Sequence, residues 1–158
     1  MADEPMTRDQ STESLHASIR RLAQLFASRR VAARLADVAG TDLSQQGIAM
    51  VRVLLREREL PIAELALMAR MDLGAVSRQL RVMEAAGIVT RKEAPSDRRV
   101  ALVRLTRSGK ALAQRIRRIE LDQLGRVFTD WDTADLDRLA DLLGRMVDDL
   151  AGTEFRRP

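Results

Sequence analysis

The stretch that most constrains the fold runs from residue 72 to residue 106, because the spacing of its apolar residues changes part-way along. In the first half, apolar side chains recur three and four residues apart, which predicts a helix that buries one face. These side chains are Leu73, Val76, Leu80 and Met83. In the second half, two β-rich runs at 88–93 and 100–105 flank a Pro-Ser-Asp turn, which predicts a β-hairpin with a long tip. The sequence therefore indicates a mainly α fold with a small antiparallel sheet.

Both ends of the predicted helix carry boundary signals. The carboxylate of Asp72 can accept hydrogen bonds from the free amides of the first turn. Gly87 can adopt the left-handed conformation that is common just beyond a helix end. We expect a shorter helix over 62–69 and a turn at 70–72, so the two helices form a helix-turn-helix.

The face opposite the apolar stripe carries small and guanidinium side chains. Gly74 and Ser77 would let the backbone approach the major groove of a duplex, and the forked guanidinium of Arg78 could take two acceptors on a guanine edge. For Arg81, contact with DNA and simple solvation fit the sequence equally well. Gln79 either contacts a phosphate or fills the flank of the helix.

The hairpin tip places Arg98 and Arg99 next to each other, directly after Asp97. Adjacent like charges repel, so this pair does not stabilise the turn, whereas a narrow minor groove concentrates negative potential and would receive one of them. Charge along the chain is also uneven. Residues 70–118 hold 13 Lys and Arg against 4 Asp and Glu, a balance of +9, although the whole chain carries only +4. This distribution is typical of a phosphate-binding surface.

Taken together, these residues resemble the winged helix-turn-helix of the MarR family of bacterial transcription regulators. The matching motifs are Val76-Ser77-Arg78, Glu84-Ala85-Ala86-Gly87-Ile88-Val89, Asp97-Arg98-Arg99, and Leu105-Thr106 with Gly109. The resemblance implies a DNA-binding repressor that recognises a specific double-stranded sequence. We expect the DNA contacts to come from Ser77, Arg78, Gln79, Arg81, Arg98 and Arg99. In the family pattern Arg99 is the arginine of the minor groove, and Asp97 is the carboxylate that orients it.

Amphipathic segments flank this region on both sides. We expect a flexible arm over 1–10, one long helix over 11–40, a DNA-binding lobe over 41–106, two helices within 107–152, and a tail over 153–158. A single chain would expose the apolar faces of the outer helices to water, which favours association. The family resemblance likewise implies a homodimer, with two recognition helices about 34 Å apart on an inverted repeat.

The resemblance also implies a small effector, often aromatic or phenolic, bound between the dimerisation helices and the DNA-binding lobe. His16 and Arg20 lie one turn apart on the first predicted helix and could place a cation beside an anionic ligand. The alternative is that His16 is a surface or interface residue and that Arg20 only forms a salt bridge.

Composition excludes several other classes. The chain has no cysteine and one histidine, and it has no glycine-rich phosphate loop, so we expect no enzyme, no redox sensor and no thiolate metal site, and we expect no cofactor. The polar N-terminal segment and the lack of a long apolar run predict a cytoplasmic protein without a signal peptide. The main alternative is a winged-helix module that contacts only proteins, and Arg78 and Arg99 argue against it.

Overall fold

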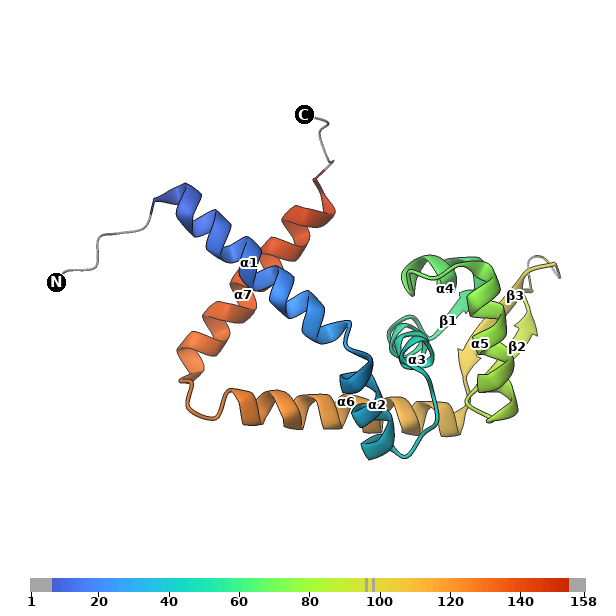
Figure 1. Ribbon diagram of the computed structural model, residues 1–158. Coiled ribbons are helices and arrows are strands. Elements are labelled where there is room, and N and C mark those ends of the chain that lie inside the picture. The colour runs from blue at the N-terminus through green and yellow to red at the C-terminus, as the bar shows by residue number, and fades with distance from the viewer. Residues whose placement is uncertain (1–6, 96, 98, 154–158) are drawn as a thin grey trace. The chain divides into compact units, whose positions relative to one another are not determined.

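The computed structural model describes residues 7–95, 97 and 99–153, and most of these residues are helical (Figure 1). The contacts divide the chain into two units after residue 119. This division falls within the long helix α6 (Arg107–Val127). No described helix combines the length and the apolar character needed to span a bilayer.

The segment expected to form one helix over 11–40 forms two, α1 (Arg8–Phe26) and α2 (Arg29–Ala39). The break falls at Ser28, whose extended backbone (ψ 116°) interrupts the helical path. Serine favours non-helical conformations, which is consistent with a break at this residue. No stronger signal marks the break in the sequence, because no glycine or proline lies near Ser28. The end at Gly40 is confirmed, because this residue adopts the left-handed conformation with φ 63°.

The predicted arm over 1–10 is also shorter than expected. Thr7 caps α1 through a reciprocal pair of hydrogen bonds, in which its hydroxyl accepts from the Gln10 amide and its own amide donates to the Gln10 side chain. This capping box supplies partners for two free amides of the first turn and starts the helix at Arg8. The rest of the predicted arm, residues 1–6, lies outside the described residues.

The central elements form the predicted helix-turn-helix and hairpin. In chain order they are α3 (Gln45–Glu57), β1 (Glu59–Pro61), α4 (Ile62–Met68), α5 (Leu73–Ala85), β2 (Val89–Glu93) and β3 (Ala101–Leu105). The sheet is antiparallel with strand order β1-β3-β2. Figure 1 shows the β2–β3 hairpin, called the wing below, beside α5 with its tip at the end farthest from α6.

The core of the first unit lies between α3, α4, α5, the sheet and the first half of α6. Its largest fully buried side chains are Ile48, Met50, Leu54, Leu65, Leu80, Met83 and Ile116. Three of the four apolar residues expected to face inward from α5 are buried, but Leu73 is 55% exposed. Leu73 is the first residue of α5, and helical side chains lean towards the N-terminus, so Leu73 points past the end of the core.

The first turn of α6 is attached to the corner between α5 and β2. The carbonyl of Gly87 accepts from the hydroxyls of Thr106 (2.6 Å) and Ser108 (2.7 Å). The Thr106 hydroxyl also accepts from the amide of Gly109 at 3.0 Å. A Cβ atom on Gly109 would lie 2.0 Å from the carbonyl oxygen of Ile88, so only glycine fits there.

The terminal helices differ from this core. Asp132 caps α7 (Thr133–Ala151) by accepting from the amide of Asp135 at 2.7 Å. Neither α1 nor α7 contains a buried residue. Their large apolar side chains that are at least 40% exposed are Leu15, Leu22, Leu25 and Phe26 in α1, and Leu142, Leu143, Val147 and Leu150 in α7.

We expect Gly109→Ala to lower the free energy of unfolding by about 3 kcal/mol, because the added methyl group would displace the Ile88 carbonyl. Gly125→Ala is the matched control in the same helix, since a Cβ there meets nothing within 4 Å. The control should raise stability by about 0.5–1 kcal/mol, the usual helical preference for alanine over glycine. Urea denaturation measures both values, and equal effects would contradict the proposed steric role of Gly109.

Candidate nucleic-acid interface

The outer face of α5 presents the arginines that the sequence singled out. Asp72 begins the helix by accepting from the amide of Ala75 at 2.8 Å, as predicted. Arg78 and Arg81 are exposed, and Ser77 is half-buried. The guanidinium of Arg78 lies over the first turn of the helix, where a Cβ atom on Gly74 would be 3.4 Å from its Nη1. The predicted arrangement of a small first turn followed by an exposed guanidinium is therefore present.

Gln79 is held by α3. The hydroxyl of Ser44 donates to Oε1 of Gln79 at 2.9 Å and accepts from the amide of Gly47 at 3.2 Å. A Cβ on Gly47 would lie 2.8 Å from Nε2 of Gln79, so the glycine makes room for this amide. Of the two roles predicted for Gln79, these contacts favour packing on the flank of the helix.

The tip of the wing is closed by Asp97. Its Oδ1 accepts from the backbone amide of Arg99 at 2.9 Å, and its carbonyl accepts from the amide of Val100 at 3.0 Å. This geometry is an Asx turn. Asp97 therefore acts on the main chain of Arg99, and the exposed guanidinium of Arg99 extends from the closed turn. Arg98, the other predicted tip contact, lies outside the described residues.

The cations of this surface fall into two groups. Arg91 pairs with Glu84 at 2.8 Å, and Lys92 pairs with Glu59 at 2.9 Å. Arg78, Arg81 and Arg99, by contrast, form no ion pair with any carboxylate that the structure describes. An external anion can therefore reach their guanidinium groups without competing with a protein carboxylate.

The turn between α4 and α5 contains Arg70 where a glycine is common. Arg70 adopts φ 53°, and the amide of Met71 donates to the carbonyl of Ala66 at 2.9 Å. A left-handed arginine is strained relative to glycine at the same position. The side chain of Arg70 is exposed.

Comparison with known proteins identifies the domain that carries this surface. Residues 43–101, from the residues before α3 to the start of β3, match the model of the MarR family. Over these residues the chain is similar to the MarR family. The members of this family are transcription regulators and not enzymes, and this agrees with the expectation from composition.

Two relatives from Bacillus subtilis carry the same kind of domain. YxaD, described as an HTH-type transcriptional regulator, is 32% identical over 85 residues, which are 54% of this chain and 59% of YxaD. The chain therefore spans little more than half of that relative. YdgJ, described in the same words, is 27% identical over 116 residues, which are 73% of this chain and 71% of YdgJ.

Solved structures share the fold over most of the chain. A MarR-family protein from Bacillus stearothermophilus has a TM-score of 0.79 at 14% identity, covering 92% of this chain and 99% of its own. Apo MarR from E. coli has a TM-score of 0.70 at 21% identity, with coverages of 91% and 98%. FabT from Streptococcus pneumoniae, solved in complex with DNA, has a TM-score of 0.68 at 16% identity, with coverages of 92% and 98%. These likenesses show the MarR winged-helix fold.

Two interactions of this MarR-family domain were missed in the sequence. The contact between Ser44 and Gln79 joins residues 35 positions apart, so no local pattern announces it. The pair of Glu84 and Arg91 did leave a signal. Arg91 is in register with the buried Val103, so its side chain leaves β2 on the face that packs on the core. A charged side chain on that face requires an ion-pair or hydrogen-bond partner.

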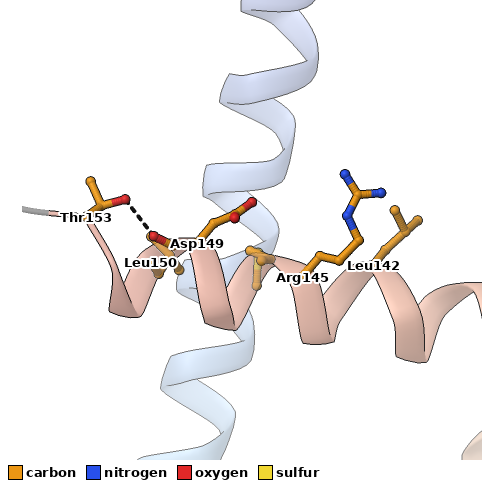
Figure 2. A pocket seen from close by; sticks show the side chains of 6 residues that line it. Leu142, Arg145, Asp149, Leu150 and Thr153 are labelled. Atoms are coloured by element: carbon orange, nitrogen blue, oxygen red, sulfur yellow. Dashed lines mark hydrogen bonds between the residues drawn. The ribbon is translucent and has the colours of Figure 1, made fainter.

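The residues predicted to bind an effector lie on α1. His16 and Arg20 are both exposed, and among the described residues no ion pair or hydrogen bond joins either of them to another predicted site residue. A hollow of about 290 Å³ lies on α7, lined by Leu142, Arg145, Met146, Asp149, Leu150 and Thr153. Figure 2 shows that these side chains follow one helix, with Thr153 Oγ1 donating to the Asp149 carbonyl at 2.6 Å. The part of the chain that the structure describes contains no group of three or more His, Cys, Asp or Glu that could hold a metal ion.

Proposed function

We propose that this protein represses transcription by binding an inverted-repeat operator in double-stranded DNA as a homodimer. The observation that carries the proposal is the pair of exposed guanidinium groups at Arg78 and Arg99. They stand on two elements of one winged helix-turn-helix and pair with no carboxylate among the described residues. An unpaired cation in water favours no protein structure, but it can neutralise a phosphate or read a groove.

In this proposal α5 is the recognition helix and enters the major groove. Arg78 contacts a base edge, since its guanidinium can bond both acceptors of guanine. Ser77 and Arg81 contact the flanking backbone, and Gln79 supports the helix from α3 through its bond with Ser44. The short side chains of the first turn allow the backbone of α5 to come close to the DNA.

The wing takes the adjacent minor groove. Arg99 enters the groove, because a narrow groove over A·T pairs has the strongest negative potential. Asp97 keeps the tip closed by accepting from the backbone amide of Arg99. This hydrogen bond offsets the repulsion between the Asp97 carboxylate and the DNA phosphates. Arg98 would contact a neighbouring phosphate.

The homodimer is supported by the outer helices. They expose an apolar stripe along α1 and another along α7, and neither helix buries a side chain. Contiguous apolar surface of this kind is unfavourable in water and is covered when two copies associate. A twofold pair then presents two recognition helices to two half-sites.

Release by a small aromatic or phenolic ligand is the last part of the proposal. Such a ligand would bind beside the dimerisation helices, with its anionic group next to His16 and Arg20, and would favour a dimer whose recognition helices do not match the operator spacing. Both side chains are exposed on α1 and therefore open to a ligand.

Selection from a pool of random duplexes by the purified protein tests the proposal. We expect enrichment of an inverted repeat whose half-sites are about 10 base pairs apart, and sedimentation should give two chains per bound duplex. Affinity should fall by about 10³ or more between 50 and 200 mM salt, as expected for a protein that neutralises several phosphates. A monomer whose contact with duplex DNA does not respond to salt would refute the proposal and favour a module for protein contacts.

We expect Arg78→Ala to cost about 1–3 kcal/mol on the selected operator and to relax the base preference at one position of each half-site. Arg30→Ala removes an equal charge from the exposed face of α2 and serves as the control. Competition titrations with single-base variants measure the effect. Unchanged discrimination between bases would show that Arg78 does not read a base.

Arg99→Ala should weaken binding most on operators whose flanks are rich in A·T pairs, since only these flanks narrow the minor groove. The titration compares two duplexes that share their half-sites and differ only in the flanks. Equal losses on A·T-rich and G·C-rich flanks would contradict the minor-groove position of Arg99.

A further inference from the structure

The ion pair between Glu84 and Arg91 joins the two elements that read DNA in the proposed function. Glu84 lies in the last turn of α5, and Arg91 is the middle residue of β2. Oε2 of Glu84 and Nη2 of Arg91 are 2.8 Å apart, and about one third of each side chain is exposed. The pair therefore bridges the recognition helix and the wing across the corner at residues 86–88.

Arg91 is built into this corner on its other side as well. It is in register with Val103 of β3, which is fully buried. Its Nε is buried and has no hydrogen-bond partner among the described residues. Burying a donor without a partner costs free energy, because its hydrogen bonds to water are lost. A solvated arginine at this position would not lose them.

The geometry of the wing makes this corner sensitive. β2 has five residues, which span about 17 Å in an extended strand. A rotation of about 10° at the corner would move the tip by about 3 Å, more than the tolerance of a preorganised contact. The angle between α5 and β2 therefore decides whether Arg78 and Arg99 reach their two grooves together.

We propose that the ion pair of Glu84 and Arg91 fixes the angle between the recognition helix and the wing, so that both residues are positioning residues for DNA recognition. This inference rests on the proposed function, because it concerns how the two grooves are read at once. In this inference Arg91, although it is a cation on the DNA-binding lobe, pairs with Glu84 and does not contact a DNA phosphate.

Another ion pair of the wing provides a matched control. Lys92 pairs with Glu59 at 2.9 Å and joins β2 to β1 without touching α5. Glu84→Gln and Glu59→Gln each remove one carboxylate from an ion pair with a cation of β2, so both change the net charge by the same amount. Electrostatics alone would tighten binding of all duplexes in both variants.

The first measurement is the ratio of affinities for A·T-flanked and G·C-flanked operators that share their half-sites. We expect Glu84→Gln to lower this ratio at least about threefold, a modest coupling energy between contacting residues, and Glu59→Gln to leave it unchanged. If the two variants changed this ratio equally, the proposal would be overturned, because the effect would then come only from the negative charge that each variant removes.

The second measurement separates positioning from direct contact. If Arg91 acts through Glu84, the double variant Glu84→Gln with Arg91→Met should lose no more discrimination than either single variant, and Arg91→Lys should retain most of it. If the losses from Glu84→Gln and Arg91→Met add, Arg91 contacts DNA itself and the proposal is wrong.

The third measurement does not involve DNA. The chain has no cysteine, so spin labels can be attached at Val82→Cys on α5 and Pro95→Cys on the wing without other changes. Labelled protein is diluted with unlabelled chains to remove distances between copies. We expect Glu84→Gln to broaden the distribution of distances between the labels and Glu59→Gln to leave it unchanged. If the wild type has no flank preference, the minor-groove part of the proposed function fails, but this distribution still decides whether the ion pair fixes the wing.

Discussion

The structure depends on the carbonyls at the corner between α5 and β2. The Gly87 carbonyl accepts two hydroxyl groups, and the Ile88 carbonyl accepts from the amide of Thr106 at 3.0 Å while lying against Gly109. Three elements meet at these two residues: the recognition helix, the wing and α6. Ile88 is buried, so its carbonyl would be costly without a partner, and the first turn of α6 both supplies that partner and fixes the start of its own helix.

The DNA-binding lobe carries cations on its surface that pair with no carboxylate among the described residues. Arg78, Arg81 and Arg99 gain nothing from a carboxylate in the described residues, and like charges across the lobe repel one another. The energy that holds them in place comes from the apolar core below, in which Leu80, Met83 and Val103 are fully buried. In the proposed function, one face of α5 therefore recognises DNA and the opposite face stabilises the fold.

Local signals made much of this fold predictable, and distant contacts set the limit. Asp72 and Gly87 marked the two ends of α5 in the sequence, because caps act within a few residues. The break at Ser28 was missed because serine only weakly opposes a helix, and Leu73 because a first-turn side chain leans away from the core. The bond from Ser44 to Gln79 depends on the packing of α3 against α5, which no spacing encodes. The DNA-contacting roles of the site residues and the effector role of His16 and Arg20 stay predictions, since they involve molecules outside the chain.

In the proposed function, assembly and DNA recognition use different residues of this chain. The core of the DNA-binding lobe is completed within a single chain, because α3, α4, α5 and the sheet bury their apolar side chains against one another. The apolar side chains of α1 and α7 lack such cover, so in the proposed homodimer the energy of association comes from the helices at the ends of the chain. The lobe can therefore keep its internal geometry whether one copy or two are present. In the proposed homodimer, association sets the number of lobes on one duplex and the distance between them, and for a repeated site that distance determines affinity.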